Sequence, residues 1–305
     1  MPSNALNIPV VSIIIPTYNH AHFLESALQS VINQTYKEWE VIVVNNFSDD
    51  NTIDVVNDFD DPRIKLINFQ NNGIIASGRN KGISQSRGKY IAFLDSDDIW
   101  YPDKLKECLE LLNQGFDLVC HGEFWVKTDN SKRHIIYGPE KNACYRSLLF
   151  NGNCISTSAT VVRKEALDKV GGFCESPDMV TAEDYDLWLK LSKSDIKIGF
   201  VKKILGEYRI HDANHSKAVL VNMKAEQAVI EKHISMLRPL NMYEKLLERR
   251  RNGLVFYTAG RGFQANREYI NALIYFFKAS KIFPFIGRLY IAAIMCLFHK
   301  IVLRS

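Results

Sequence analysis

The sequence predicts an α/β protein with a mainly parallel, doubly wound sheet, followed by a helical C-terminal region. In the first half, short β-branched runs typical of buried strands alternate with segments whose apolar residues recur at helical spacing. After about residue 215 only the helical pattern continues. Residues 219–305 hold 14 Lys and Arg against 5 Asp and Glu, so this tail carries +9 while the body carries −5. We therefore expect a domain boundary near residue 215.

The individual elements follow from the apolar pattern. We expect strands at residues 10–15, 40–44, 64–67, 90–94, 116–120 and 158–162, and helices at 23–32, 48–59, 80–86, 102–112, 163–170 and 184–192. Pro16 ends the first strand, Ser48 suits the N-cap of the second helix, and Pro102 suits the first residue of the fourth. Ligands of such sheets bind at the carboxyl ends of the strands, so we expect the site there.

Several classes of protein are disfavoured. The six cysteines form no C-x-x-C pair, which argues against a disulfide scaffold or a zinc finger, and the N-terminus has no basic region typical of a secretory signal. We expect reduced thiols and a cytoplasmic working domain. The glycines from Gly73 to Gly78 lack the Lys-Ser/Thr of a P-loop, and no serine-hydrolase elbow or metalloprotease motif is present. No nucleic-acid motif accompanies the basic tail.

Three aspartates close the fourth predicted strand. Asp95, Asp97 and Asp98 follow a hydrophobic run, and carboxylates brought together repel unless a cation neutralises them. Mg²⁺ or Mn²⁺ would do so, and such ions also hold substrate phosphates. The alternative is a solvated acidic turn in which Asp98 caps the next helix.

The order of several motifs resembles the family 2 glycosyltransferases, which have the GT-A fold and use nucleotide sugars. The matching stretches are residues 11–19, 41–52, 72–73, 76–82, 90–102, 182–189 and 208–211. The resemblance covers about residues 8–215, so it implies a GT-A catalytic domain at 1–215 and a basic helical region at 216–305.

The resemblance also implies a metal and nucleotide site. Asp95 and Asp97 would be the D-x-D acids that hold the ion, and His211 would complete the metal or diphosphate site, unless it is an ordinary loop histidine. The implied nucleotide-binding residues are Pro16, Thr17, Tyr18, Asn19, Asn46, Ser48, Arg79, Asp95 and Ser96. Thr17 and Tyr18 could equally be ordinary strand-end residues, and Arg79 an arginine on a helix surface.

One departure concerns the nucleobase. The family usually has an acid after the second strand to read uracil N3–H, and here Asn45 and Asn46 stand in its place. The Asn46 amide oxygen still accepts a hydrogen and its NH₂ still donates one. A UDP-sugar is therefore our first expectation, with guanine and thymine nucleotides left open.

The second acidic cluster lies at residues 183–186. Inverting transfer needs a carboxylate to take the proton of the acceptor hydroxyl, and the resemblance implies Asp184 as this base, with Glu183 second. The structural alternative is a capping box, with Thr181 as N-cap and Asp184 three residues on. The two roles are compatible, because a carboxylate at a helix N-terminus is stabilised as an anion.

The tail suggests where the acceptor lies. Leu289–Phe298 is apolar but too short to span a bilayer, so it lies at a membrane interface or packs as a terminal helix. Our hypothesis is that the tail, with Arg249–Arg251, docks on the inner leaflet near a lipid-linked acceptor.

We expect an inverting, metal-dependent glycosyltransferase that transfers a sugar to a saccharide or lipid-linked acceptor in cell-surface polysaccharide or lipopolysaccharide assembly. A sugar nucleotidyltransferase and a catalytically decayed sugar- or lipid-binding scaffold are the alternatives.

Overall fold

The computed structural model describes residues 8–210 and 219–302, with side chains as far as residue 298. The chain packs into two compact units. The first unit comprises Met1–Tyr145, Cys154–Glu175 and Asp186–His211, and the second comprises Arg146–Asn153, Ser176–Tyr185 and Asp212–Ser305. The functional division at residue 215 stays a prediction.

The parallel half of the sheet follows the predicted strands. Its strands are β1 (Val11–Thr17), β2 (Trp39–Asn45), β3 (Ile64–Asn68) and β4 (Tyr90–Phe93), in the order β3-β2-β1-β4. All three pairings are parallel. The strands β1, β2 and β4 are buried along their whole length, as expected for β-branched runs covered on both faces.

Strand β1 does not end at Pro16, contrary to the expectation. Pro16 pairs in register with Val44 of β2. The Ile14 carbonyl accepts from Leu94 N–H beyond the end of β4, so Pro16, two residues later, faces the same side. Strand β4 ends at Phe93, before it reaches the level of Pro16. The absence of an N–H group in proline therefore removes no hydrogen bond between the two strands.

The rest of the sheet is mixed. Its strands are β5 (Ile99–Trp100), β6 (Leu118–Lys127), β7 (Lys132–Ile135), β8 (Thr160–Arg163) and β9 (Ile198–Ile210). Strand β8 is antiparallel to β4 and β6, whereas β9 is parallel to β6. The sheet order is therefore β3-β2-β1-β4-β8-β6-β9-β5, with β7 paired to β6. This α/β architecture confirms the predicted fold class, although its second half mixes strand directions.

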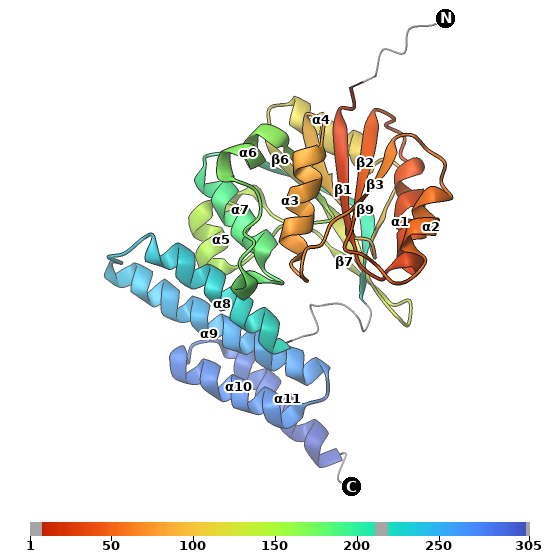
Figure 1. Cartoon of the computed structure of the whole chain (residues 1–305). Helices are drawn as coiled ribbons and strands as arrows, with labels where there is room; N and C mark the ends of the chain where they lie inside the picture. The colour runs from red at the N-terminus through yellow and green to blue at the C-terminus, as the bar shows by residue number, and fades with distance from the viewer. Residues whose placement is uncertain (1–7, 211–218, 303–305) are drawn as a thin grey trace, which may run out of the picture. The chain divides into compact units, whose positions relative to one another are not determined.

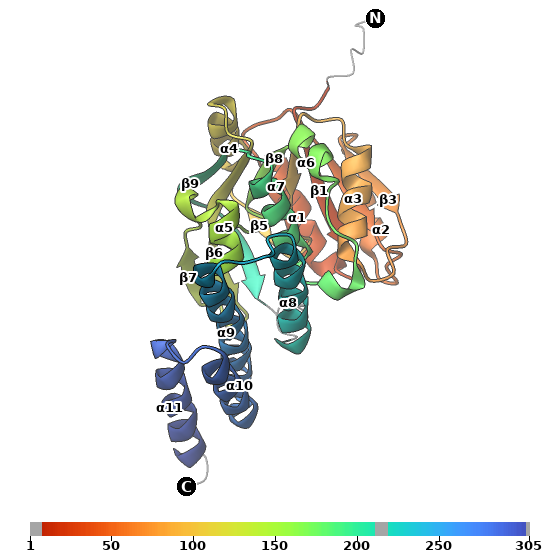
Figure 2. The same cartoon turned by 90° about the vertical axis from the view of Figure 1, so that its left-hand side faces the viewer.

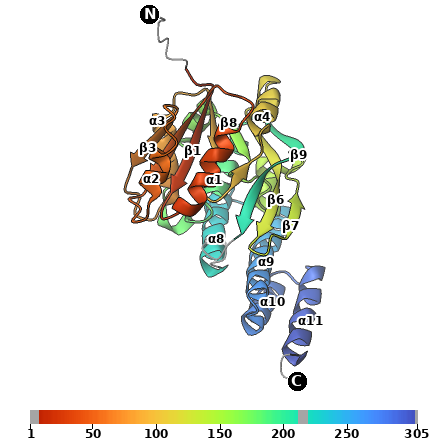
Figure 3. The ribbon, with the colours of Figure 1, turned by 90° about the vertical axis from the view of Figure 1, so that its right-hand side faces the viewer.

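Helices cover both faces of the sheet in the first unit (Figure 1). They are α1 (Ala21–Ile32), α2 (Thr52–Asn57), α3 (Ile75–Gln85), α4 (Lys104–Asn113) and α6 (Lys164–Val170), with the 3₁₀ turn η1 at Glu140–Asn142. Helices α1 and α4 share a core with Val11, Ile13 and Ile15. Figure 3 shows α1 in front of β1, and α3 lies on the other face, where a Cβ at Gly82 would overlap Ile14.

Two helix starts differ from the sequence prediction. Helix α2 begins at Thr52, where Asp50 Oδ1 accepts from the backbone N–H and the hydroxyl of Thr52, so Ser48 is not its N-cap. Helix α4 begins at Lys104, so Pro102 lies before it. In both cases a residue nearer the helix takes the N-cap position, namely Asn51 for α2 and Asp103 for α4.

The second unit is helical. It contains most of α5 (Tyr145–Asn151), the 3₁₀ turn η2 (Pro177–Met179), the first residues of α7 (Glu183–Lys193), and α8 (Val219–Ser235), α9 (Met242–Ala265), α10 (Tyr269–Ile282) and α11 (Gly287–Val302), the last four shown in Figure 2. Helices α9, α10 and α11 share an apolar core around Phe276 and Cys296. A capping box closes the start of α9, because Asn241 and Glu244 exchange side-chain-to-backbone hydrogen bonds.

The three arginines of α9 do not form one exposed patch, contrary to our docking hypothesis. Arg251 is buried, and its guanidinium donates to Glu226 Oε1 at 2.5 Å and to the Leu149 carbonyl at 3.2 Å. Arg250 donates to Asn151 Oδ1 at 3.0 Å. Arg251 is therefore a structural residue of the second unit and cannot face a membrane.

Candidate active site

The aspartate turn lies at the carboxyl end of β4. Asp98 N–H donates to the Asp95 carbonyl at 3.0 Å, which closes the turn. Asp95 and Asp97 are partly exposed, whereas Ser96 and Asp98 are buried. The turn therefore presents the two D-x-D acids to solvent and points the third aspartate into the protein.

Ser158, which lies two residues before β8, fixes this turn. The Ser158 hydroxyl donates to Asp98 Oδ2 at 2.5 Å, and the Asp95 backbone N–H donates to Ser158 Oγ at 3.1 Å. The other oxygen of Asp98, Oδ1, accepts the Arg209 backbone N–H at 3.0 Å. Asp98 thus ties the turn both to β8 and to the end of β9. The alternative that Asp98 caps the following helix is wrong, because Asp103 holds that position.

The turn concentrates negative charge. Burial raises the pKa of Asp98 well above its usual range, and the nearby charges of Asp97, Glu123 and Asp95 raise it further. Burial likewise raises the pKa of Glu123 to about 7. The carboxylates are therefore close enough to repel one another, which is the situation that a bound cation relieves.

Arg79 lies beside the turn. Its Nη2 donates to Asp95 Oδ1 at 2.6 Å, and the guanidinium carbon lies 5.3 Å from the centre of the Phe173 ring. Arg79 is buried, so the alternative of an arginine on the helix surface is wrong. Its charge is therefore held beside the aspartate turn at the carboxyl end of β4.

The donor set suits a hard divalent ion. Asp95 and Asp97 supply carboxylate oxygens, which Mg²⁺ and Mn²⁺ prefer, and such ions are commonly bound by one or two carboxylates plus substrate phosphates. Within residues 8–210 and 219–302, no group of three or more His, Cys, Asp or Glu residues is arranged to hold a metal. His211, the third expected ligand, lies outside the described residues.

The ends of β1 and β2 form the neighbouring part of the site. Asn19 N–H donates to Ser48 Oγ at 2.9 Å, and Asn19 Oδ1 accepts from Asp49 N–H at 2.8 Å, so these residues tie the two loops together. The Thr17 hydroxyl is buried without a hydrogen-bond partner in the described part of the chain. Tyr18 is exposed.

The two asparagines after β2 have different environments. Asn45 is buried, and its side chain donates to Asn68 Oδ1 at 2.8 Å and accepts from Ser48. Asn46 is partly exposed, and its Oδ1 accepts from Asn71 N–H at 2.9 Å. A second lone pair on the Asn46 oxygen can still accept a hydrogen. Because Asn45 is buried, only Asn46 of the two asparagines is accessible to a ligand.

Two further residues of the site, His20 and Ser158, carry no sequence motif. His20, after β1, lies with its Nδ1 2.9 Å from Ser96 Oγ and joins the β1 loop to the aspartate turn. Ser158 is the other. Both interactions join residues at least 60 positions apart. A contact between residues so far apart in the chain depends on the tertiary fold and cannot be predicted from the residues next to His20 or Ser158.

The candidate base residues lie at the start of α7. Helix α7 begins at Glu183, two residues after Thr181, whose φ is 82°. Thr181 N–H donates to Glu183 Oε2 at 2.8 Å, and the Thr181 hydroxyl has no partner among the described residues. The expected capping box between Thr181 and Asp184 is therefore wrong. Both acids still lie in the first helical turn, as expected.

Within the second unit, the residue after Asp184 is firmly held. Tyr185 is buried, and its hydroxyl donates to the Leu148 carbonyl at 2.8 Å. Arg251 Nη2 donates to the same hydroxyl at 3.4 Å. The first turn of α7 is therefore anchored to α5 and α9.

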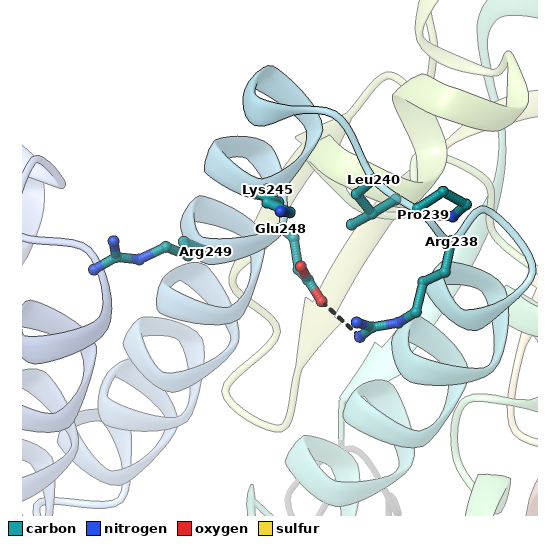
Figure 4. Close-up of a pocket in the computed structure, with 6 residues that line it drawn as sticks. All are labelled: Arg238, Pro239, Leu240, Lys245, Glu248 and Arg249. Carbon is teal, nitrogen blue, oxygen red and sulfur yellow. Dashed lines mark hydrogen bonds and ion pairs between the residues drawn. The ribbon is translucent and has the colours of Figure 1, made fainter.

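A separate hollow of about 720 Å³ also lies in the second unit. It is lined by Arg238, Pro239, Leu240, Lys245, Glu248 and Arg249 (Figure 4). Arg238 pairs with Glu248 at 3.3 Å, whereas Arg249 points away from it and donates to the Ile282 carbonyl. The guanidinium groups of Arg238 and Arg249 therefore do not converge on one point of the hollow.

Known proteins resemble this chain in sequence. The model of glycosyl transferase family 2 matches residues 12–171, which is more than half of the chain. The Escherichia coli enzyme WfgD, named UDP-Glc:alpha-D-GlcNAc-diphosphoundecaprenol beta-1,3-glucosyltransferase, is 34% identical over 72% of this chain and 85% of its own. Bacillus subtilis TuaG, named as a glycosyltransferase of teichuronic acid biosynthesis, is 31% identical over 66% of this chain and 79% of its own.

Solved structures share the fold. S. aureus TarS residues 1–349, in complex with UDP-GlcNAc, has a TM-score of 0.65 at 18% identity, over 94% of this chain and 88% of that one. The Pyrobaculum calidifontis mannosyltransferase PcManGT, in complex with GDP-Man and Mn²⁺, has a TM-score of 0.59 at 15% identity, over 95% of this chain and 81% of that one. Together with the sequence match, the fold and the aspartate turn place this chain in glycosyl transferase family 2, as a glycosyltransferase of the GT-A fold.

Proposed function

We propose that this glycosyltransferase transfers a sugar, with inversion and with the help of Mn²⁺ or Mg²⁺, from a nucleoside-diphosphate donor to a saccharide or lipid-linked acceptor. The observation that carries the proposal is the turn after β4, which presents Asp95 and Asp97 while Asp98 and Ser158 anchor it. Such an arrangement holds two acids in fixed positions despite their mutual repulsion.

The divalent ion would be held by Asp95 and Asp97, with His211 as a further ligand, and when bound it would stabilise the negative charge that develops on the leaving diphosphate. Arg79 adds a buried positive charge beside Asp95. In this proposal Ser96, Pro16 and Tyr18 would lie along the same nucleotide. Because Arg79 has a planar donor fork, it suits a phosphate oxygen as well as a carboxylate.

The protein supplies a base for the acceptor. In our proposal the acceptor oxygen attacks the anomeric carbon, the bond from that carbon to the diphosphate oxygen breaks, and the hydroxyl proton goes to Asp184, or to Glu183 as the second choice. A single displacement inverts the anomeric centre. Both acids lie in the first turn of α7, and either would act as the base through its carboxylate.

A uridine nucleotide is our first choice for the donor. The partly exposed Asn46 has an oxygen that accepts from uracil N3–H and an NH₂ group that donates to a base carbonyl. The buried Thr17 hydroxyl, which has no partner within the described ranges, offers another polar group near the end of β1. Support also comes from the relatives, because the printed name of WfgD specifies UDP-Glc.

The relatives also support an acceptor attached to a lipid. The name of WfgD specifies a diphosphoundecaprenol acceptor, and that of TuaG specifies teichuronic acid biosynthesis. We propose that this chain acts likewise in cell-surface polysaccharide or lipopolysaccharide assembly, on the cytoplasmic side of the membrane. None of the helices in the described ranges has the length and apolarity needed to cross a bilayer.

The proposed division of labour follows the sequence. Residues 1–215 would form the catalytic domain, and residues 216–305 a basic region that serves the acceptor side. Glu183 and Asp184 belong to the second unit by packing. Variants in α9 that destabilise this unit are therefore expected to affect the base as well as the tail.

The test is the release of nucleoside diphosphate from a panel of UDP-, GDP- and dTDP-sugars with Mn²⁺, with and without a lipid-linked saccharide acceptor. Wild type should release one nucleotide preferentially, and chelation of the metal should stop release. Asp97→Ala should lower the rate at least a hundredfold, whereas the matched control Asp129→Ala, in the exposed turn between β6 and β7, should not change it.

The remaining outcomes separate the alternatives. Asp184→Asn should abolish transfer while leaving donor binding intact, and Glu183→Gln should do so instead if Glu183 is the base. No release from any donor in wild type would refute the enzyme and favour a decayed scaffold. Release of inorganic diphosphate from nucleoside triphosphate and sugar phosphate would identify a nucleotidyltransferase instead.

A further inference from the structure

Helix α11 is apolar on both faces. Its inner face contributes Leu289, Ala292 and Cys296 to the core of the second unit. Its outer face, which we define as Tyr290, Ile291, Ile294, Met295, Leu297 and Phe298, is between 47% and 64% exposed at every position. A helix that only packs against its own domain normally has polar residues on its outer face. The packing alternative therefore accounts for only one side of this helix.

The outer face is continuous. Successive residues of an α-helix are about 100° apart, so the α11 outer face covers an arc of roughly 160° over about two and a half turns. No charged side chain interrupts it between Arg288 and Phe298. Just before the helix, Phe285 is 82% exposed. Exposed apolar surface gathered in this way marks an interaction site more often than single exposed residues do.

The surrounding charge is of one sign. From Tyr269 to Val302 the sequence holds no Asp or Glu but has four Lys and Arg residues, namely Lys278, Lys281, Arg288 and Lys300. Lys281 lies with its Nζ 4.6 Å from the centre of the Phe277 ring, and Lys278 4.5 Å from that of Tyr275. Basic side chains whose stems lie along aromatic surface suit the boundary between acyl chains and anionic headgroups.

We propose that the α11 outer face, with Phe285 and the flanking cations, binds the surface of an anionic lipid bilayer. The apolar stretch covers about 15 Å, half of a bilayer core, so α11 lies in the plane of the interface. A second copy of this chain fits less well as the occupant, because a symmetric pair of such faces would bring like charges together with no acid to neutralise them. The inference rests on the proposed function, because binding to the bilayer would bring the enzyme close to an acceptor that is anchored in it by a lipid.

The test uses the full chain and vesicles of phosphatidylcholine with or without 30% phosphatidylglycerol, a composition in which anionic headgroups are about a third of the surface. Wild type should float with the anionic vesicles and bind the neutral ones at least tenfold more weakly. The double variant Ile294→Ser, Phe298→Ser should lose at least tenfold in vesicle affinity. Arg288→Gln should weaken binding to the anionic vesicles alone.

The matched control is Ile136→Ser, because Ile136 and Ile294 are both 52% exposed but Ile136 lies in the first unit, just after β7. It should bind vesicles like wild type. Thermal melts should show that all variants are folded, since the replaced side chains lie on the surface. Unchanged vesicle binding by the double variant would overturn the proposal. It would also be overturned if neither protein bound vesicles and wild type were a dimer that the double variant converted to a monomer.

The two proposals fail separately. If α11 binds membrane and the enzyme is as proposed, the double variant should keep the donor-only release of nucleotide and lose transfer to an acceptor embedded in vesicles. Vesicle binding without any nucleotide release would refute the function but leave the membrane surface. Full activity on the embedded acceptor with no vesicle binding would refute the surface alone.

Discussion

Ser158→Ala removes one hydroxyl that serves two parts of the aspartate turn. The hydroxyl donates to Asp98 Oδ2 at 2.5 Å and accepts from Asp95 N–H at 3.1 Å. Ser158 is 2% exposed and Asp98 1% exposed, so water cannot easily replace it. Losing a hydrogen bond to a carboxylate costs about 1.5–3 kcal/mol and orphaning an N–H about 1–3 kcal/mol, so with partial relaxation we expect a loss of about 2–4 kcal/mol in unfolding free energy. The melting temperature should fall by roughly 5–15 °C.

The functional consequence concerns the metal. Partners that orient metal-binding carboxylates typically contribute 10–100-fold to metal affinity. Ser158→Ala should therefore raise the Mn²⁺ concentration for half-maximal nucleotide release about 10–100-fold, and saturating Mn²⁺ should restore most of kcat. The assay is a Mn²⁺ titration of nucleotide release at a temperature where both proteins are folded. Calorimetric titration with Mn²⁺ provides a readout independent of turnover.

The controls separate stability from positioning. Ser86→Ala also removes a buried hydroxyl, which donates to the Ile83 carbonyl at 2.6 Å, but it touches neither aspartate. It should lower stability without changing the Mn²⁺ dependence. Ser158→Thr keeps the hydroxyl and should restore the wild-type value in part. Identical Mn²⁺ curves for Ser158→Ala and wild type would refute the reasoning.

Two further predictions concern buried cations. Arg251→Lys keeps the charge but loses the fork that contacts Glu226 and Tyr185, so urea denaturation should show a loss of about 1–3 kcal/mol in the second unit, and an unchanged midpoint would contradict its anchoring role. Burial lowers the pKa of Lys104 from 10.5 to about 7. The cost of burying this group therefore lowers the free energy of unfolding by its full amount below pH 7, by less as the pH rises, and by nothing above pH 10.5. Lys104→Met should therefore raise stability by about 1–3 kcal/mol at pH 6, after allowing for the lost stacking on Trp100, and the gain should disappear toward pH 10.5.

The sequence was most informative where the relevant interactions are local. The strands β1 to β4 and the position of Asp95 and Asp97 directly after the fourth of them could be predicted, because β-branched runs form buried parallel strands. The buried position of Arg79 could not be predicted. Its helical periodicity is the same whether it points to solvent or to the strand ends, and only the fold decides between them.

The errors arose where tertiary contacts override local preference. Thr181 has the sequence of an N-cap, but its backbone takes a positive φ of 82° and the helix starts two residues later. Arg251 belongs to a run of three arginines that looks like an exposed patch, yet the helix rotates it into the second unit. The 13-residue strand β9 was missed because its central Lys202 and Lys203 interrupt the apolar pattern.

The departure at Asn45 has a structural reason. An amide there donates to Asn68 through its nitrogen and accepts from both the backbone N–H and the hydroxyl of Ser48 through its oxygen. A carboxylate could accept both hydrogens from Ser48 but has no hydrogen to donate to Asn68 Oδ1, so an aspartate at position 45 would require the Asn68 amide to turn its NH₂ group toward it. Asn45 is thus committed to holding the ends of β2 and β3 together. Because Asn45 is 0% exposed, our proposal assigns recognition of a nucleobase on this side to Asn46, whose backbone N–H donates to the Thr17 carbonyl at 3.0 Å.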